Sequence, residues 1–204
     1  MCKVLLTVLL SAVSIYRCTM PNAGVETTNG VTIVASANKI EGITPPFSGV
    51  YLFNRDYIPF IDSGTGLGTT TGSEGGFRFT IEPTASYNIA VVSADARTSA
   101  LFSVSRSYTS DDNVPLLRPA AITGSVSAAI NGPILVILKG TGYYHLLSSP
   151  QTFTFESVPS GTHNLQVFVL ATAQGEKRIV KEGTPKIIVV LPGALYDAGV
   201  LVVE

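Results

Sequence analysis

The sequence predicts an all-β protein of two tandem β-sandwich domains that follow a cleaved signal segment. Glycine (19 residues) and proline (12 residues) punctuate short apolar runs rich in Val, Ile, Thr and Phe, which is typical of short strands joined by turns. One pattern of alternating strands occurs twice along the chain. The apolar spacing of three and four residues that marks an amphipathic helix does not persist in the sequence.

Composition narrows the class of protein. The 204 residues suffice for one large domain or two small ones. A content of 46% hydrophobic and 13% charged residues argues against disorder, because a disordered chain needs charge instead of buriable surface. The formal charge of −1 gives no basis for nucleic-acid binding, which requires clustered Lys and Arg. After residue 17 no apolar run reaches the roughly 18 residues of a membrane span.

Residues 1–17 fit a signal peptide. The stretch MCKVLLTVLLSAVSIYR has one cation, Lys3, followed by an apolar run from Val4 to Ile15. A run of about 7–15 apolar residues after a basic start is the secretory pattern and is too short for a spanning helix. We therefore expect an exported protein.

Two cleavage sites are compatible with this segment. Ala12 and Ser14 are small residues at −3 and −1 of an ordinary signal peptidase site. Alternatively, the region resembles the lipobox of bacterial lipoproteins, in which an apolar run ends just before a cysteine, here Cys18 with Ile15 at −3. Tyr16 and Arg17, which lie between Ile15 and Cys18, depart from the lipobox pattern, because small residues are usual at these two positions.

Cysteine usage favours the lipoprotein interpretation. The chain has two cysteines, and Cys2 lies in the segment that would be removed. A lone exported thiol suggests a specific role, and lipid attachment at Cys18 would hold the protein at a membrane surface. Residues 18–30 then form a small, polar tether. Thr19 in place of aspartate after the cysteine implies the outer membrane as the destination in a bacterium with two membranes.

The repeat defines the two domains. GGFRFTIEPTASYNIAVV (residues 75–92) and PQTFTFESVPSGTHNLQVFV (residues 150–169) align with a constant offset of 76 residues. This offset pairs an aromatic residue with an aromatic (Phe77 with Phe153), a proline with a proline (Pro83 with Pro159) and an aliphatic with an aliphatic (Ile89 with Leu165). Upstream, residues 30–36 are aligned with 121–127, and residues 49–54 with 132–140.

Each copy predicts two strands joined by a turn. Phe-x-Phe places two aromatic rings on one face of a strand, because side chains alternate with period two. A proline-containing turn and a second alternating strand follow, which predicts a hairpin that packs its apolar face on another sheet. Arg118-Pro119 disfavours helix and suits a linker. We therefore place the domains at residues 31–118 and 119–204.

Both copies resemble the carboxypeptidase-regulatory-like, or transthyretin-like, β-sandwich domains of exported bacterial proteins. The shared features are a threonine-rich turn, Gly-x-Phe-x-Phe, a turn with Pro and Gly, and Tyr-x-Leu-x-Val, as in GTTTGSEGGFRFTIEPTASYNIAVV and FTFESVPSGTHNLQVFV. The closing KIIVVLPGALYDAGVLVVE is similar to the last two strands of that family around a Pro-Gly turn. The resemblance covers roughly residues 30–204 and implies an Ig-like sandwich, but it does not fix an activity.

Motifs for catalysis, metals and cofactors are weak, and we assign none. Gly64–Gly68 lacks the following helix of a phosphate-binding loop. His145 and His163 are too few for a zinc site, and His163 matches Tyr87 of the first copy, which favours packing at the edge of the core. Asp111-Asp112 offers too few oxygen ligands for calcium. We therefore do not expect an enzyme.

Tyrosines offer a candidate contact surface. Tyr51, Tyr57, Tyr143 and Tyr144 cluster near the ends of predicted strands and could contact a ligand, although packing at sandwich edges is the favoured explanation. The sequence thus indicates a non-catalytic cell-envelope lipoprotein that acts as a membrane-tethered structural or adhesive module. The partners would be the membrane, through the lipid, and a protein or polysaccharide. Alternatives are a carbohydrate-binding accessory module, an enzyme or an accessory chain of one, a subunit that assembles by strand addition, and a secreted or periplasmic form without lipid.

Overall fold

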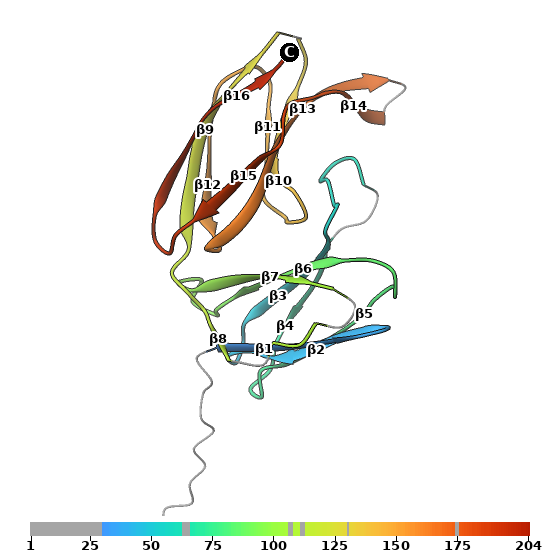
Figure 1. The fold of residues 1–204 in the computed structure, drawn as a ribbon, viewed down its shortest axis with the longest axis vertical. Helices are drawn as coiled ribbons and strands as arrows, with labels where there is room; N and C mark the ends of the chain where they lie inside the picture. Colours follow the sequence, from blue (N-terminus) through green and yellow to red (C-terminus); the bar gives the residue numbers. More distant parts are fainter. Residues whose placement is uncertain (1–29, 63–65, 106–107, 111–112, 130, 174–175) are drawn as a thin grey trace, which may run out of the picture.

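The computed structural model describes residues 30–62, 66–105, 108–110, 113–129, 131–173 and 176–204. These residues form sixteen β-strands and no helix (Figure 1). The predicted all-β fold class is confirmed. The signal segment, Cys18, most of the tether, Gly64 and Asp111-Asp112 lie outside the described residues. We call residues 30–118 the N-terminal half and residues 119–204 the C-terminal half.

Two four-stranded sheets form the N-terminal half. One has the order β5-β2-β1-β8 and the other the order β4-β3-β6-β7. The strands are β1 (Gly30–Ser36), β2 (Lys39–Ile43), β3 (Gly49–Asn54), β4 (Leu67–Thr70), β5 (Gly76–Thr80), β6 (Tyr87–Val92), β7 (Ser99–Val104) and β8 (Val114–Pro115). Buried side chains from both sheets make one cluster, which includes Ile33, Ile40, Leu52, Phe77, Phe79, Ile89, Val91 and Phe102.

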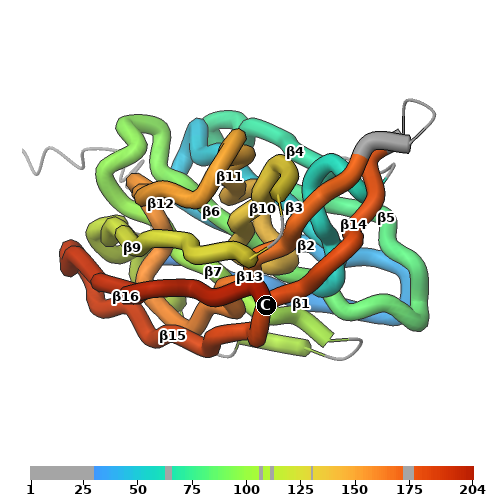
Figure 2. The backbone as a smooth tube through the Cα atoms, turned by 90° about the horizontal axis from the view of Figure 1, so that it is seen from above, coloured from blue at the N-terminus to red at the C-terminus, as the bar shows by residue number. Residues whose placement is uncertain are grey.

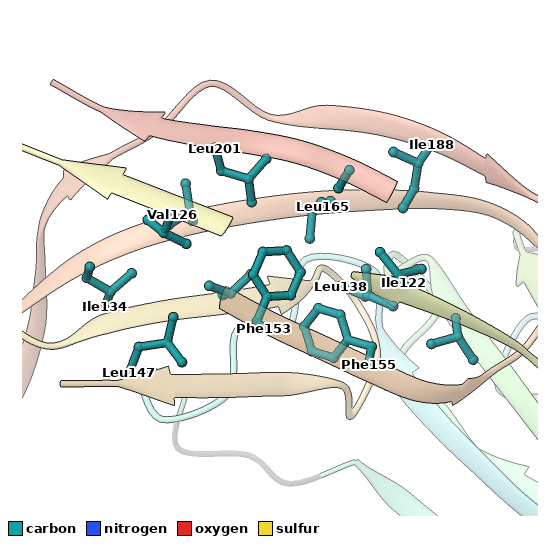
Figure 3. Close-up of a cluster of buried hydrophobic side chains, with 14 of the residues drawn as sticks. Ile122, Val126, Ile134, Leu138, Leu147, Phe153, Phe155, Leu165, Ile188 and Leu201 are labelled. Carbon is teal, nitrogen blue, oxygen red and sulfur yellow. The ribbon is translucent and has the colours of Figure 1, made fainter. Parts of the chain in front are cut away.

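The C-terminal half also packs two sheets face to face. A three-stranded sheet has the order β12-β9-β16, and the other sheet runs β11-β10-β13-β14 with β15 also paired to β13. The strands are β9 (Ala120–Ala128), β10 (Ile134–Leu138), β11 (Tyr144–Leu147), β12 (Thr152–Val158), β13 (Gly161–Ala173), β14 (Glu176–Glu182), β15 (Lys186–Val190) and β16 (Leu195–Val203). Figure 3 shows side chains of both sheets meeting in this core.

The Phe-x-Phe strands behave as the alternation predicts. In β5 and in residues 152–156 of β12 every second side chain is buried, and the rings of Phe77, Phe79, Phe153 and Phe155 all face the interior. The residues between them, such as Arg78 and Thr154, are exposed. The period of two in the sequence therefore follows from a sheet with one buried face.

The predicted hairpin is wrong. β5 and β6 belong to different sheets of the N-terminal half, and β12 and β13 belong to different sheets of the C-terminal half. The turns that contain Pro83 and Pro159 therefore carry the chain across the sandwich, from one sheet to the other. Both strands bury their alternating residues in the same core from opposite sides, so a pattern of two amphipathic strands fits this arch as well as a hairpin.

The upstream alignment of the repeat also needs correction. β5 pairs with β2, which places Phe77 opposite Gly42, and β12 pairs with β9, which places Phe153 opposite Gly124. A Cβ atom on either glycine would come within 2.8 Å of the ring it faces. The equivalent of residues 121–127 is therefore β2, not the predicted residues 30–36. The glycine is needed because the aromatic ring packs over its backbone.

The halves are stacked along the long axis of the molecule (Figure 1). The loop between β3 and β4 rises from the N-terminal half toward β14 of the C-terminal half. Seen from above, β15 and β16 run side by side along one margin (Figure 2). One contact between the halves is thus made by a loop of one half on a sheet of the other.

Candidate functional site: the junction between the halves

A set of polar contacts joins the halves at Gly140. The Gly140 amide donates to the Tyr57 carbonyl (3.1 Å), and the Asn88 side-chain amide donates to the Gly140 carbonyl (3.0 Å). Asn88 is buried, and its Oδ1 accepts a hydrogen bond from the Ser103 hydroxyl (3.0 Å). Gly140 has φ +70°, and a Cβ there would meet the Arg55 carbonyl at 2.5 Å. This close approach of two backbones therefore requires glycine.

An ion pair lies beside these hydrogen bonds. Lys139 Nζ is 2.8 Å from Asp56 Oδ1. The hydrogen bond from Lys139 and then its positive charge lower the pKa of the Asp56 carboxyl below its ordinary value of 3.8. Because the Asp56 side chain is largely exposed, the pair orients the loop more than it stabilises the fold.

Apolar side chains form the second part of the junction. Leu135, Ile137, Phe168 and Leu170 lie on the outer face of β10 and β13, where they would otherwise face water. Ile58 and Ile61 of the N-terminal half pack against them, together with Ile179 of β14. The loop between β3 and β4 therefore acts as an apolar cover for the second sheet of the C-terminal half.

Sequence reasoning missed this cover, although a signal for it is present. The five residues of β10, Ile-Leu-Val-Ile-Leu, are all buried. A strand with one wet face shows alternation, whereas a run that is apolar at every position indicates burial on both faces. The run ILVIL therefore predicts that something covers the outer face of this sheet.

Aromatic rings surround the apolar contact. Phe53 stacks on Tyr57 with ring centroids 5.7 Å apart. Phe60 meets Tyr144 edge-on at 4.8 Å, and the ammonium of Lys177 lies 4.4 Å from the centre of the Phe60 ring. Phe60 has φ +70°, a conformation that costs a bulky residue about 1–3 kcal/mol. These contacts hold the strained residue in place.

The four candidate tyrosines all lie at or beside this junction. Burial raises the pKa of Tyr57, with smaller contributions from Asp62 and Tyr144. Burial also raises the pKa of Tyr143 to about 12, with a smaller contribution from Tyr51, and the Tyr143 hydroxyl donates to the Ser157 carbonyl (2.5 Å). Tyr57 and Tyr143 are thus engaged in packing.

Tyr51 and Tyr144 differ from the other two because they remain available to solvent. They are 45% and 44% exposed. Tyr51 lies within β3, and Tyr144 begins β11. These two rings are the part of the predicted tyrosine patch that a ligand could reach.

The histidines bind backbone carbonyls. His145 Nε2 lies 2.6 Å from the Thr154 carbonyl, and His163 Nε2 lies 2.7 Å from the Pro159 carbonyl. His163 is buried, and this burial lowers the pKa of its imidazole below 6.5 although the Pro159 carbonyl opposes the shift. Among the described residues no three His, Cys, Asp or Glu side chains gather as a metal site would require.

Two hollows adjoin the junction. The larger, about 720 Å³, lies under the loop between β3 and β4, and its polar lining consists of Asn54, Asp56, Tyr57, Asp62, Thr80, Glu82 and Tyr87. The Asp62 carboxylate there accepts a hydrogen bond from the Ile58 amide (2.6 Å), so it stabilises its own loop. The smaller, about 250 Å³, lies between the halves on the side of β7 and β15.

Comparison with known proteins finds only distant structural likeness. No protein-family model and no curated protein matches the chain. Among solved structures, the minor pilin GBS52 of Streptococcus agalactiae is 11% identical, with a TM-score of 0.29, over 79% of this chain and 84% of the pilin. A candidate cell adhesion protein of Bacteroides fragilis is 9% identical, with a TM-score of 0.22, over the same shares of the two chains. At these scores neither likeness supports a functional argument.

The described residues include no helix that is long and apolar enough to cross a membrane.

Proposed function

We propose that the protein is a non-catalytic cell-envelope lipoprotein that acts as a membrane-tethered structural or adhesive module. Residues 1–17 would direct export and then be removed, and a lipid on Cys18 would anchor the chain in the outer membrane. Residues 18–30 would serve as the tether. Residues 31–118 and 119–204 would be the two domains of the exposed part.

The junction between the halves is the observation that carries this proposal. Hydrogen bonds, an ion pair and an apolar cluster act at the same contact. Such a contact holds two sandwiches as one stiff body, whereas a bare linker would let them move independently. The tether would enter at β1 in the N-terminal half, and the C-terminal half stands beyond that half along the long axis (Figure 1). The arrangement suits a spacer that presents the C-terminal half to a partner.

The mass of the mature protein tests the anchor. After extraction from membranes, we expect an intact mass that begins at Cys18 and includes diacylglycerol. A matched Cys18→Ser chain should leave the membrane fraction while its strand content, measured by circular dichroism, stays unchanged. An unlipidated chain that begins at Ile15 would show instead that Ser14 precedes an ordinary cleavage site.

A carbohydrate-binding accessory module is the second candidate. Two exposed rings, Tyr51 and Tyr144, favour it, because sugars stack on accessible aromatic faces. Retention on an immobilised polysaccharide should fall when both tyrosines are changed to alanine. Phe47→Ala is the control, since Phe47 is a ring outside the junction that is even more exposed (59%) than the two tyrosines. Equal retention of all three chains would reject this candidate.

A further inference from the structure

The smaller hollow between the halves has the composition of a binding site for one polar ring. Its lining combines charged and polar groups with two aliphatic side chains, and the residues that matter here are Arg55, Lys139, Thr162, Asn164, Leu101 and Ile187. Its volume of about 250 Å³ corresponds to about eight water molecules at their liquid volume. It is smaller than the range of about 300–1,000 Å³ for drug-sized ligands, so it suits a single sugar-sized unit.

The hollow contains more positive than negative charge. The Lys139 ammonium is balanced by Asp56 at 2.8 Å. Arg55 is exposed at the rim and makes no ion pair within 4.0 Å among the described residues, although its charge also lowers the pKa of Asp56. Asp56 is the one acid in the part of the lining that the structure describes, so two cations share a single carboxylate. A guanidinium group binds a carboxylate through two parallel hydrogen bonds. The charge that Arg55 leaves uncompensated therefore favours a ligand with one carboxylate.

The strand at the base of the hollow has unused hydrogen-bonding capacity. Asn164 Oδ1 is buried and has no hydrogen-bond partner among the described residues. Buried acceptors are rarely left unpaired in native proteins, and a rotation of the Asn164 side chain would turn this oxygen toward a ligand hydroxyl in the hollow that the residue lines. Thr162, two residues earlier on β13, adds an exposed hydroxyl. A hydroxylated ring can donate to Asn164 and exchange hydrogen bonds with Thr162.

Two aliphatic side chains give the hollow an apolar wall. Ile187 of β15 is 64% exposed, and Leu101 of β7 faces it from the other half. A sugar ring presents both C–H groups and hydroxyls, so it can cover these side chains while its polar groups meet the amide and the guanidinium. Sites between domains commonly have this mixture of apolar wall and few polar groups.

We propose that the hollow between β7 and β15 binds an acidic monosaccharide unit, such as a hexuronate, with its carboxylate on Arg55 and a hydroxyl on Asn164. Because Arg55 belongs to the N-terminal half and Asn164 to the C-terminal half, the ligand would also bridge the two. This inference goes beyond the proposed membrane tether and does not depend on it, so the intact-mass measurement and the ligand titration can fail separately.

A titration with glucuronate tests the proposal, using the full chain carrying Cys18→Ser. Amide chemical shifts and calorimetry measure the binding. Glucose and acetate serve as matched probes that lack the carboxylate or the ring. We expect saturable binding of glucuronate, with shifts in β7, β13 and β15, and at least tenfold weaker binding of glucose and acetate. Arg55→Gln and Asn164→Ala should each weaken glucuronate binding about tenfold, the usual effect of losing one charged or buried hydrogen bond.

Two control chains keep the test specific. Arg97→Gln removes an exposed arginine elsewhere in the N-terminal half and should leave binding unchanged. The Tyr51→Ala/Tyr144→Ala chain should also bind normally. The proposal is overturned by an absence of saturable glucuronate binding, by equal binding of acetate, or by equal binding of glucose. It is also overturned if the tyrosine variant, and not Arg55→Gln, loses the ligand.

Discussion

In the N-terminal half, the chain between β7 and β9 runs along β1 of one sheet and β7 of the other. In the C-terminal half, the connection from β14 to β15 lies along the edge strand β16. Ser110 exchanges hydrogen bonds with Ile33 of β1 through its amide and hydroxyl, and Leu117 pairs with Ser99 of β7. In the C-terminal half, Lys186 Nζ donates to the Ala198 carbonyl of β16 (2.7 Å), and Gly183 approaches the Val202 carbonyl. The two halves thus share a core pattern but finish their sheets differently.

Two strands of the C-terminal half, β15 and β16, expose many aliphatic side chains. Six large aliphatic side chains on or beside β15 and β16 are 50–71% exposed: Ile187, Val189, Leu191, Leu195, Val200 and Val202. Their inward neighbours, including Ile188, Val190 and Leu201, belong to the core. The run KIIVVL reads as a fully buried strand in sequence, but only one face of β15 packs on the core, so Ile187 and Val189 on its other face lie in water. Strand position, and not strand composition, decides the burial here.

The largest expected effect tests whether the two cores are equivalent. Phe77→Ala and Phe153→Ala should each lower the free energy of unfolding by about 3–5 kcal/mol, because both truncate a buried aromatic ring. Denaturant unfolding measures the loss, and Phe47→Ala is the exposed control. Losses below about 1 kcal/mol for both would mean that these rings do not form the cores.

Substitution of the glycines opposite those rings should destabilise the two halves by different amounts. A Cβ on Gly42 would lie 2.1 Å from the Thr32 carbonyl, whereas a Cβ on Gly124 would first meet the movable Phe153 ring at 2.8 Å. Gly42→Ala should therefore cost more than Gly124→Ala, within the range of about 1–3 kcal/mol for overpacking. Adding Phe153→Leu should reduce the penalty of Gly124→Ala. Equal costs, or the reverse order, in denaturant unfolding would contradict this packing.

The junction should have a smaller energetic effect than either core. Asn88→Ala removes the donor to the Gly140 carbonyl and should lower the free energy of unfolding by about 1–2 kcal/mol. Ser103→Ala removes only the partner of Asn88 Oδ1 and should cost less. If the junction joins the halves as described, calorimetry of Asn88→Ala should show less cooperative unfolding. An unchanged single transition would argue against this coupling.

The smallest expected effect is a pH dependence confined to the C-terminal half, where His163 replaces Tyr87. Burial lowers the folded-state pKa of His163 below 6.5. Below that pH the unfolded chain binds the proton more readily, so stability is present above pH 6.5 and is lost as the pH falls through the interval between the two pKa values. Stability curves should show this slope in the wild type and not in His163→Phe. A slope that persists in the variant would assign it to other groups.

The sequence alone determined the fold class and the inward-facing residues of the repeated strands. Alternation in Phe77-x-Phe79 and Phe153-x-Phe155 is a local property that a half-buried strand imposes wherever its sheet lies. The offset of 76 residues likewise identified matching core positions. The glycine pair could have been found from Ile40-Glu41-Gly42 and Ile122-Thr123-Gly124, but three residues with loose similarity were a weaker signal than the longer apolar run nearby.

Only the tertiary structure decided which strands share a sheet and which faces are covered. An arch and a hairpin bury the same alternating residues, so the proline turns could not distinguish them. The four tyrosines were predicted as one group, but whether each ring packs or faces solvent depends on the loop between β3 and β4 meeting Gly140. The hollow that contains Arg55 and Asn164 joins residues more than a hundred positions apart. Such contacts depend on the packing of one half against the other, of which the uniformly apolar run of β10 shows only that its sheet is covered and not which residues cover it.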